Sequence, residues 1–316
     1  MPPRNVVSLV QSNVAGQKLV GVLLTLMLAA ALLLAASACS QAPPPPALGP
    51  SLGQAENQKS LPANPESQNP PRLSPIEAEA EVLRLQGAFA REVPHAILHS
   101  MSSDQIWIER VRAAIEASDW TIIRPQLLVV VDRNPGVEEL RIMMVEQDGP
   151  WQVIGGSKVS TGQAGRRDYY ITPIGVFLHT DAILDYRAQG TFNENHVRGL
   201  GLKGMRVWDF GWQWATKGWR ADKEGGDIRL LMHATDPKYL EPRIGRPASE
   251  GCVRIPATMN RFLDRHGVLD ADYERAAVND IRYRALLMPD RVPSPLAGNA
   301  MVVVDSSDRE AFSASE

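Results

Sequence analysis

The chain has 316 residues, of which 44% are hydrophobic and 22% are charged, and its formal net charge is −3. This composition is typical of a folded globular protein, and it excludes a wholly disordered chain, a collagen-like chain and a coiled coil. The slightly acidic balance disfavours a nucleic-acid-binding protein, so no nucleic-acid partner is expected. Two cysteines, Cys39 and Cys252, are too few for a disulfide framework.

The N-terminal residues 1–38 have the pattern of an export signal. They contain Arg4 and Lys18 but no acidic residue, and residues 19–38 carry no charge. A basic start, an apolar stretch and an exit through small residues, here Ala36-Ser37-Ala38, together predict a secretory signal peptide.

Cys39 stands directly after these small residues, and this arrangement resembles the signal of a bacterial lipoprotein. The resemblance implies that Cys39 is lipidated and becomes the new N-terminus, so that the protein is exported and lipid-anchored to a membrane on the periplasmic side. Ser40 follows in place of the Asp that often marks retention in the inner membrane, which favours the outer membrane. An uncleaved signal anchor and a cleaved, soluble protein are the alternatives, and all three export the chain.

Two segments of different character precede the globular part. Residues 39–75 are rich in Pro, Ser, Gln and Asn and poor in large apolar residues, which predicts a disordered, extended tether. Residues 76–125 are expected to form a helical preface, because good helix formers fill its start and apolar residues recur later at helical steps, at Ile106, Ile108, Val111 and Ile115. We expect this preface to pack against the domain that follows.

The pattern changes to strands from residue 127 onward. Short Val-rich and Ile-rich runs alternate with turn signals such as Asn134-Pro135-Gly136, which predicts a mainly β domain over residues 126–305 with flanking helices. The expected strands are 127–131, 140–145, 151–159, 176–179, 229–233 and 301–304, and the expected helices are 256–266 and 271–286. Residues 306–316 are expected to form a tail.

The strongest chemical signal is a histidine followed by a cysteine. His233 lies in Met232-His233-Ala234-Thr235, and Cys252 follows 19 positions later in Ser249-Glu250-Gly251-Cys252-Val253-Arg254. A buried, inert thiol and a core histidine are the ordinary explanation of such residues. Three features favour chemistry instead: an unpaired thiol in an exported protein meets oxidants, Gly251 permits close approach of a substrate, and the charge of Arg254 favours the thiolate.

These two segments resemble the signature of the L,D-transpeptidase family, whose YkuD-type catalytic domain has a histidine followed by a Ser-His-Gly-Cys-x-Arg segment. The resemblance extends upstream to Ser160-Thr161-Gly162 and to Thr172-Pro173-Ile174-Gly175-Val176-Phe177. It implies a YkuD-type catalytic domain of β-sandwich or barrel-like form, with a small helical N-terminal preface. It also implies a peptidoglycan stem peptide as substrate, and neither a metal nor an organic cofactor.

Carried over to this sequence, the resemblance makes Cys252 the catalytic nucleophile and His233 the general base, oriented by a backbone carbonyl such as that of Ala234. The thiol would pass its proton to the imidazole and give an ion pair poised near neutral pH. The thiolate would then attack a tetrapeptide stem, form a thioester and pass the acyl group to an amine.

The surrounding residues receive roles from the same resemblance. Backbone amides near Gly251 and Cys252 would form the oxyanion hole, within a loop that includes Ser249. Arg254 is expected to order this loop or to meet a substrate carboxylate. Glu250 and Thr235 are the other expected substrate-binding residues.

Two features depart from the family pattern. Glu250 stands where the family usually has a histidine, and its carboxylate is expected to raise the pKa of the thiol and to oppose Arg254. Residues 182–228 are expected to form an insertion before the histidine strand. The insertion is expected to be either a platform or lid over the substrate or a small core of its own, because it holds four tryptophans: Trp208, Trp212, Trp214 and Trp219.

The acyl acceptor is left open by the sequence. A second stem amine would make the protein a crosslinking enzyme of cell-wall synthesis and remodelling. Water would make it an L,D-carboxypeptidase, and a protein amine would make it an attachment or detachment enzyme. A non-catalytic peptidoglycan-binding lipoprotein with an inert thiol is the alternative from another class.

Overall fold

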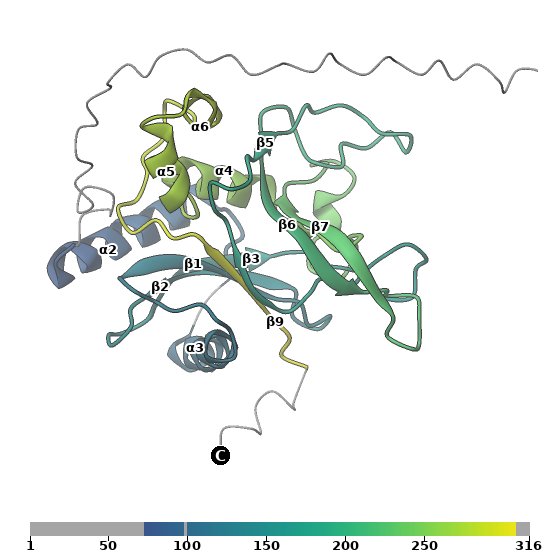
Figure 1. Ribbon diagram of the computed structural model, residues 1–316, viewed down its shortest axis with the longest axis horizontal. Coiled ribbons are helices and arrows are strands. Elements are labelled where there is room, and N and C mark those ends of the chain that lie inside the picture. The colour runs from purple at the N-terminus through teal and green to yellow at the C-terminus, as the bar shows by residue number, and fades with distance from the viewer. Residues whose placement is uncertain (1–72, 98–99, 308–316) are drawn as a thin grey trace, which may run out of the picture. The chain divides into compact units, whose positions relative to one another are not determined.

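The computed structural model describes residues 73–97 and 100–307, and Figure 1 shows how their elements are arranged. The predicted signal peptide, the predicted lipidation site Cys39 and nearly all of the predicted tether lie outside these residues. Within the described ranges, none of the helices combines the length and the apolar character needed to span a membrane.

The first sheet has five strands in the order β3-β2-β1-β9-β4. Their bounds are Gln126–Asp132 (β1), Glu139–Val145 (β2), Gln152–Lys158 (β3), Gly175–Leu178 (β4) and Ala300–Val304 (β9). All pairs are antiparallel except β1 with β9. Every residue of β1 is buried, because one set of alternate side chains enters a core on one face and the other set enters a second core on the opposite face.

Two N-terminal helices cover the two faces of this sheet (Figure 1). Helix α2 (Pro75–Glu92) begins with a capping box between Ser74 and Glu77 and packs its apolar side into the first core. Its Phe89 lies where a Cβ atom on Gly155 of β3 would be 2.3 Å from the ring, so glycine makes room for the helix.

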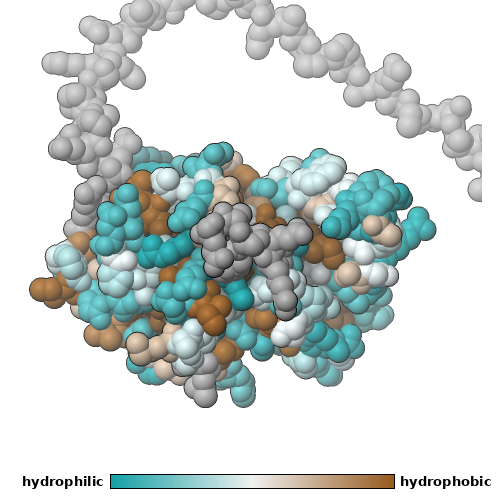
Figure 2. Space-filling view, turned by 90° about the horizontal axis from the view of Figure 1, so that it is seen from below, coloured by the Kyte–Doolittle hydropathy of each residue, from teal (hydrophilic) through white to brown (hydrophobic). Residues whose placement is uncertain are grey.

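Helix α3 (Met101–Glu116) packs into the second core through Trp107, Val111 and Ile115. Both helices within residues 75–116 thus pack against the first sheet. Figure 2 views the molecule from below, and hydrophobic residues on the visible surface are interspersed with hydrophilic ones.

The second sheet has four strands in the order β5-β6-β7-β8. Their bounds are Tyr186–Arg187 (β5), Arg206–Thr216 (β6), Gly225–His233 (β7) and Val253–Arg254 (β8), and only β7 and β8 run parallel. Residues 182–228 are continuous with the second sheet, because β6 pairs along most of β7 and places Trp208 in the first core. The four tryptophans do not form a small core of their own, since Trp212 and Trp214 are exposed.

Short helices complete the domain. They are η2 (Glu241–Arg243), α4 (Ala257–His266), α5 (Ala271–Ala277) and α6 (Ile281–Leu286). The single helix expected over 271–286 is two helices, because the Asp280 carboxylate accepts a hydrogen bond from the amide of Arg282 and starts α6 afresh. The fold is thus mainly β with flanking helices, as expected from the sequence.

A buried ion-pair network joins the second sheet to α4 and to the loop before α5. Arg206 has no exposed surface, and its guanidinium lies 2.8 Å from Asp185, 3.4 Å from Asp264 and 3.1 Å from Asp270. The ring of His179 lies between two acceptors, with Nε2 2.9 Å from Asp185 and Nδ1 2.8 Å from the carbonyl of Leu269. Burial opposes a charged imidazole, but the Asp185 carboxylate outweighs burial and raises the pKa of His179.

Candidate active site

Parallel pairing of β7 and β8 brings the predicted histidine and cysteine to one face of the second sheet. His233 ends β7 and pairs with Arg254, and Met232 pairs with Val253. Cys252 directly precedes β8. Because side chains alternate along a strand, Cys252 shares the face of Arg254 and His233, whereas Met232 and Val253 point into the core.

His233 is held as a neutral base. Its ring is buried, and Nδ1 lies 2.6 Å from the carbonyl oxygen of Ala234, the contact that the family resemblance implies. Since a carbonyl only accepts, Nδ1 carries the hydrogen and Nε2 keeps its lone pair. Burial, with a smaller contribution from the charge of Arg254, lowers the pKa of His233 to about 4.

The thiol of Cys252 is half-buried and donates to the carbonyl oxygen of Arg229, 3.8 Å away. Burial raises its pKa, the charge of Arg254 lowers it, and the charge of Glu250 raises it. The effects of Arg254 and Glu250 have the signs expected from the sequence, but burial has the largest effect on the pKa of the thiol. Both shifts favour the uncharged forms of the thiol and the imidazole, which opposes the ion pair expected near neutral pH.

The loop before Cys252 is tied together by Ser249. This buried hydroxyl donates to the carbonyl of Cys252 at 2.5 Å and accepts from the amide of Gly251 at 3.1 Å. Gly251 has φ of 129°, and a Cβ atom there would lie 2.7 Å from Ile228, so only glycine fits this position. The Gly251 amide is already bound, which corrects its expected place in the oxyanion hole.

The three expected substrate-binding residues differ in exposure. Thr235 has no exposed surface, so the expectation that it contacts substrate is wrong. Arg254 is half-buried and donates to the carbonyl of Ala248 at 3.0 Å, which is the loop-ordering contact expected as one of its two roles. Glu250 is exposed beside the thiol.

Three further residues lie around the thiol and were not predicted: Arg229, Asp209 and Tyr186. Arg229 bonds through Nε to both carboxylate oxygens of Asp209, each at 2.9 Å. Burial raises the pKa of Tyr186, and the charges of Asp209 and Cys252 raise it further. One signal could have found Arg229: positions 229, 231 and 233 alternate along a strand, so Arg229 shares the face of His233.

A buried carboxylate supports the nucleophile loop from the first sheet. Glu138, in the turn before β2, accepts from the amide of Thr161 at 2.6 Å and from its hydroxyl at 2.5 Å. The Thr161 carbonyl in turn accepts from the amides of Ala248 and Ser249 at 3.0 and 2.9 Å. This chain of bonds explains structurally why the upstream motif around Thr161 belongs with the cysteine segment.

Replacing Glu138 with glutamine will flatten the pH dependence of stability. Burial is the main cause that raises the pKa of Glu138 to about 7, and the charges of Asp132 and Asp305 add to it. The folded state therefore binds this proton more tightly than the unfolded chain does, and the free energy of unfolding falls as pH rises from about 4.5 to about 7. The contribution is roughly 3 kcal/mol.

Urea denaturation of the wild-type protein and of Glu138→Gln at pH 5, 6 and 7.5 measures this difference. Buried His233 has the opposite effect, because its lowered pKa makes the folded state less stable as pH falls below the usual pKa of histidine. This contribution is the same in both proteins, so it cancels when their slopes of unfolding free energy against pH are compared. Parallel slopes for the two proteins would contradict the assignment.

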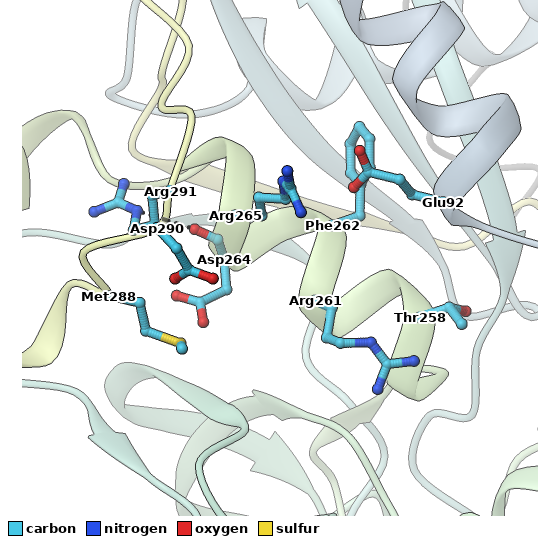
Figure 3. A pocket seen from close by; sticks show the side chains of 9 residues that line it. All are labelled: Glu92, Thr258, Arg261, Phe262, Asp264, Arg265, Met288, Asp290 and Arg291. Atoms are coloured by element: carbon cyan, nitrogen blue, oxygen red, sulfur yellow. Dashed lines mark hydrogen bonds between the residues drawn. The ribbon is translucent and has the colours of Figure 1, made fainter.

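A separate cavity of about 350 Å³ lies beside α4 (Figure 3). Arg261, Asp264 and Arg265 of α4 line it together with Asp290 and Arg291, and none of the predicted site residues does. Asp264 and Arg291 are already engaged in the buried ion-pair network. Within residues 73–97 and 100–307, no group of three or more His, Cys, Asp or Glu side chains could hold a metal ion.

The two mixed sheets and the loop that precedes Cys252 form a mainly β domain. Residues 128–271 match the family model YkuD, the L,D-transpeptidase catalytic domain. The resemblance inferred from the sequence is thereby confirmed. The match runs from β1 through α4 and includes His233 and Cys252. No curated protein matches the chain.

Proposed function

We propose that this protein is a cysteine-dependent peptidoglycan L,D-transpeptidase. The observation that carries the proposal is the β7–β8 pairing, which puts Cys252 on the face of His233 while the Ala234 carbonyl leaves Nε2 of the ring basic. The family of residues 128–271 supports a peptidoglycan substrate. The N-terminal sequence supports action outside the cytoplasm, with a lipid on Cys39 as membrane anchor.

In the first half-reaction, Cys252 Sγ attacks the carbonyl of the third stem residue while His233 Nε2 takes the thiol proton. A C–S bond forms, and the carbonyl electrons move to oxygen. The tetrahedral intermediate then expels the terminal D-residue as His233 returns the proton to the leaving nitrogen, and a thioester remains. Because thiol and imidazole are both neutral at rest, proton transfer accompanies the attack.

The amide of Cys252 itself is the proposed donor to the oxyanion, since the neighbouring Gly251 amide is bound to Ser249. Removing one such donor typically costs on the order of 3 kcal/mol of transition-state stabilisation. In the second half-reaction, an amine of another stem attacks the thioester and loses a proton to His233, and the sulfur leaves and regains its proton.

Incubation with purified disaccharide-tetrapeptide will test the acceptor. We expect a crosslinked dimer and one released D-amino acid per crosslink, measured by mass spectrometry. Tripeptide without dimer would instead assign an L,D-carboxypeptidase. No product from folded protein, with stem binding retained, would assign a peptidoglycan-binding lipoprotein, which the raised pKa of the thiol would suit. Cys252→Ala is the matched inactive control.

A further inference from the structure

Two tryptophans stand exposed on the face of the second sheet that carries Cys252. The side chains of Trp212 and Trp214 are 66% and 67% exposed. In β6 they pair with Arg229 and Asp227 of β7, and Arg229 shares its face with Cys252. We call Trp212 and Trp214 the aromatic pair.

Both rings are held in place although they face solvent. A Cβ atom on Gly225 would lie 2.4 Å from the indole of Trp214, so this ring lies against the backbone of β7 with its other side free. The guanidinium of Arg229 lies 5.8 Å from the ring centre of Trp212, and Asp209 fixes that guanidinium. Large apolar surfaces that are kept both ordered and exposed mark binding sites.

The spacing between the aromatic pair and the thiol suits a stem peptide. Cys252 lies level with Leu231, two residues from Arg229 and four from Asp227 along β7, or about 7 and 13 Å at the rise of a strand. Strands β6 and β8 flank β7 on opposite sides, so the aromatic pair is also displaced sideways from Cys252 by two strand spacings, about 10 Å. The backbone positions of Trp212 and Trp214 are therefore about 12 and 16 Å from that of Cys252. Three extended peptide residues span about 10 Å. A stem with its third carbonyl at Cys252 thus brings its first residue near Trp212, and the attached sugar extends toward Trp214.

We propose that Trp212 and Trp214 bind the sugar chain of the peptidoglycan donor, an inference that rests on the proposed function. A pyranose ring has apolar C–H faces, which stack on indoles, and hydroxyl and amide groups at its rim. Polar side chains neighbour the pair, because Arg229 and Asp227 lie opposite the two tryptophans on the same face. An apolar surface of two rings within a polar setting fits a sugar better than it fits the broad apolar core of a protein interface.

The test compares two donors, disaccharide-tetrapeptide and the free tetrapeptide without sugar. In the double variant Trp212→Ala/Trp214→Ala, we expect KM for the sugar-bearing donor to rise about tenfold with kcat unchanged. KM for the free tetrapeptide should stay at the wild-type value. The double Phe variant should recover part of the loss. Tyr239→Ala, which removes another exposed aromatic ring from outside the sheet, should change neither KM.

An equal rise in KM for both donors would overturn the inference, because the pair would then contact peptide rather than sugar. Unchanged KM for both donors would overturn it too, as would a shift from dimer to monomer in gel filtration without any donor effect. If the wild-type protein turns over neither donor, the proposed function fails separately. Isothermal titration calorimetry of disaccharide-tetrapeptide and free tetrapeptide against Cys252→Ala, with and without the aromatic pair, then decides. Weaker binding of the sugar-bearing ligand alone on removing the pair supports a sugar surface, and unchanged binding contradicts it.

Discussion

Acyl transfer will fall by at least about 10³-fold when Cys252 is replaced with alanine, because the variant has no group that can form the thioester. The melting temperature should change little, since a half-buried side chain loses a single sulfur atom. Two measurements check this result: dimer formation from disaccharide-tetrapeptide, and the mass of an adduct with a carbapenem. A carbapenem is a β-lactam, and it is expected to acylate the catalytic cysteine of this family. The wild-type protein should gain one adduct and Cys252→Ala none.

A matched variant separates the base from the nucleophile. His233→Gln keeps a polar side chain of similar size but has no basic nitrogen, so the adduct should still form on Cys252, about 10²-fold more slowly. An adduct that persists in Cys252→Ala would place the nucleophile elsewhere. Wild-type acylation rates in His233→Gln would show that the imidazole takes no proton.

Loss of the Arg206 charge will lower the free energy of unfolding more than Glu138→Gln or a substitution at a surface ion pair. Replacing Arg206 with methionine leaves Asp185, Asp264 and Asp270 with one uncompensated negative charge in a site without solvent. Removing one partner of a buried ion pair typically costs about 3–5 kcal/mol. Urea denaturation should therefore show a clearly lower midpoint with an unchanged slope.

Arg220→Met is the control for this measurement. Arg220 pairs with Asp222 and Glu224 at the surface, where water screens the charges, and its loss should leave the midpoint unchanged. If Arg206→Met and Arg220→Met unfold at the same urea concentration, the buried network contributes nothing that the surface pairs do not.

The sequence predicts the first sheet well because its central strands β1 and β9 are buried on both faces. The Val-rich runs of β1 and β9 need no knowledge of their partners to be recognised. Strand β6 could not be found in the same way. A bulge between Asp209 and Trp212, with Gly211 at φ of 77°, breaks the alternation of its side chains, and its outer half carries exposed tryptophans.

Only part of the candidate site can be predicted from the sequence. His233 and Cys252 can be recognised because family motifs record their neighbours in sequence. Their pKa values could not be predicted, because burial by distant segments outweighs the adjacent charges of Glu250 and Arg254. Glu138 carries no signal at all in the sequence, since its partner Thr161 is brought to it only by the folding of the first sheet.

Strand β9 occupies an interior place in the first sheet although it is the last strand within residues 100–307. It pairs with β1 on one side and with β4 on the other. The ribosome must therefore release almost the entire polypeptide before β4 has an edge to join, and pairings between such remote segments form slowly. During synthesis the open edge of β1 is a site for aggregation until β9 arrives.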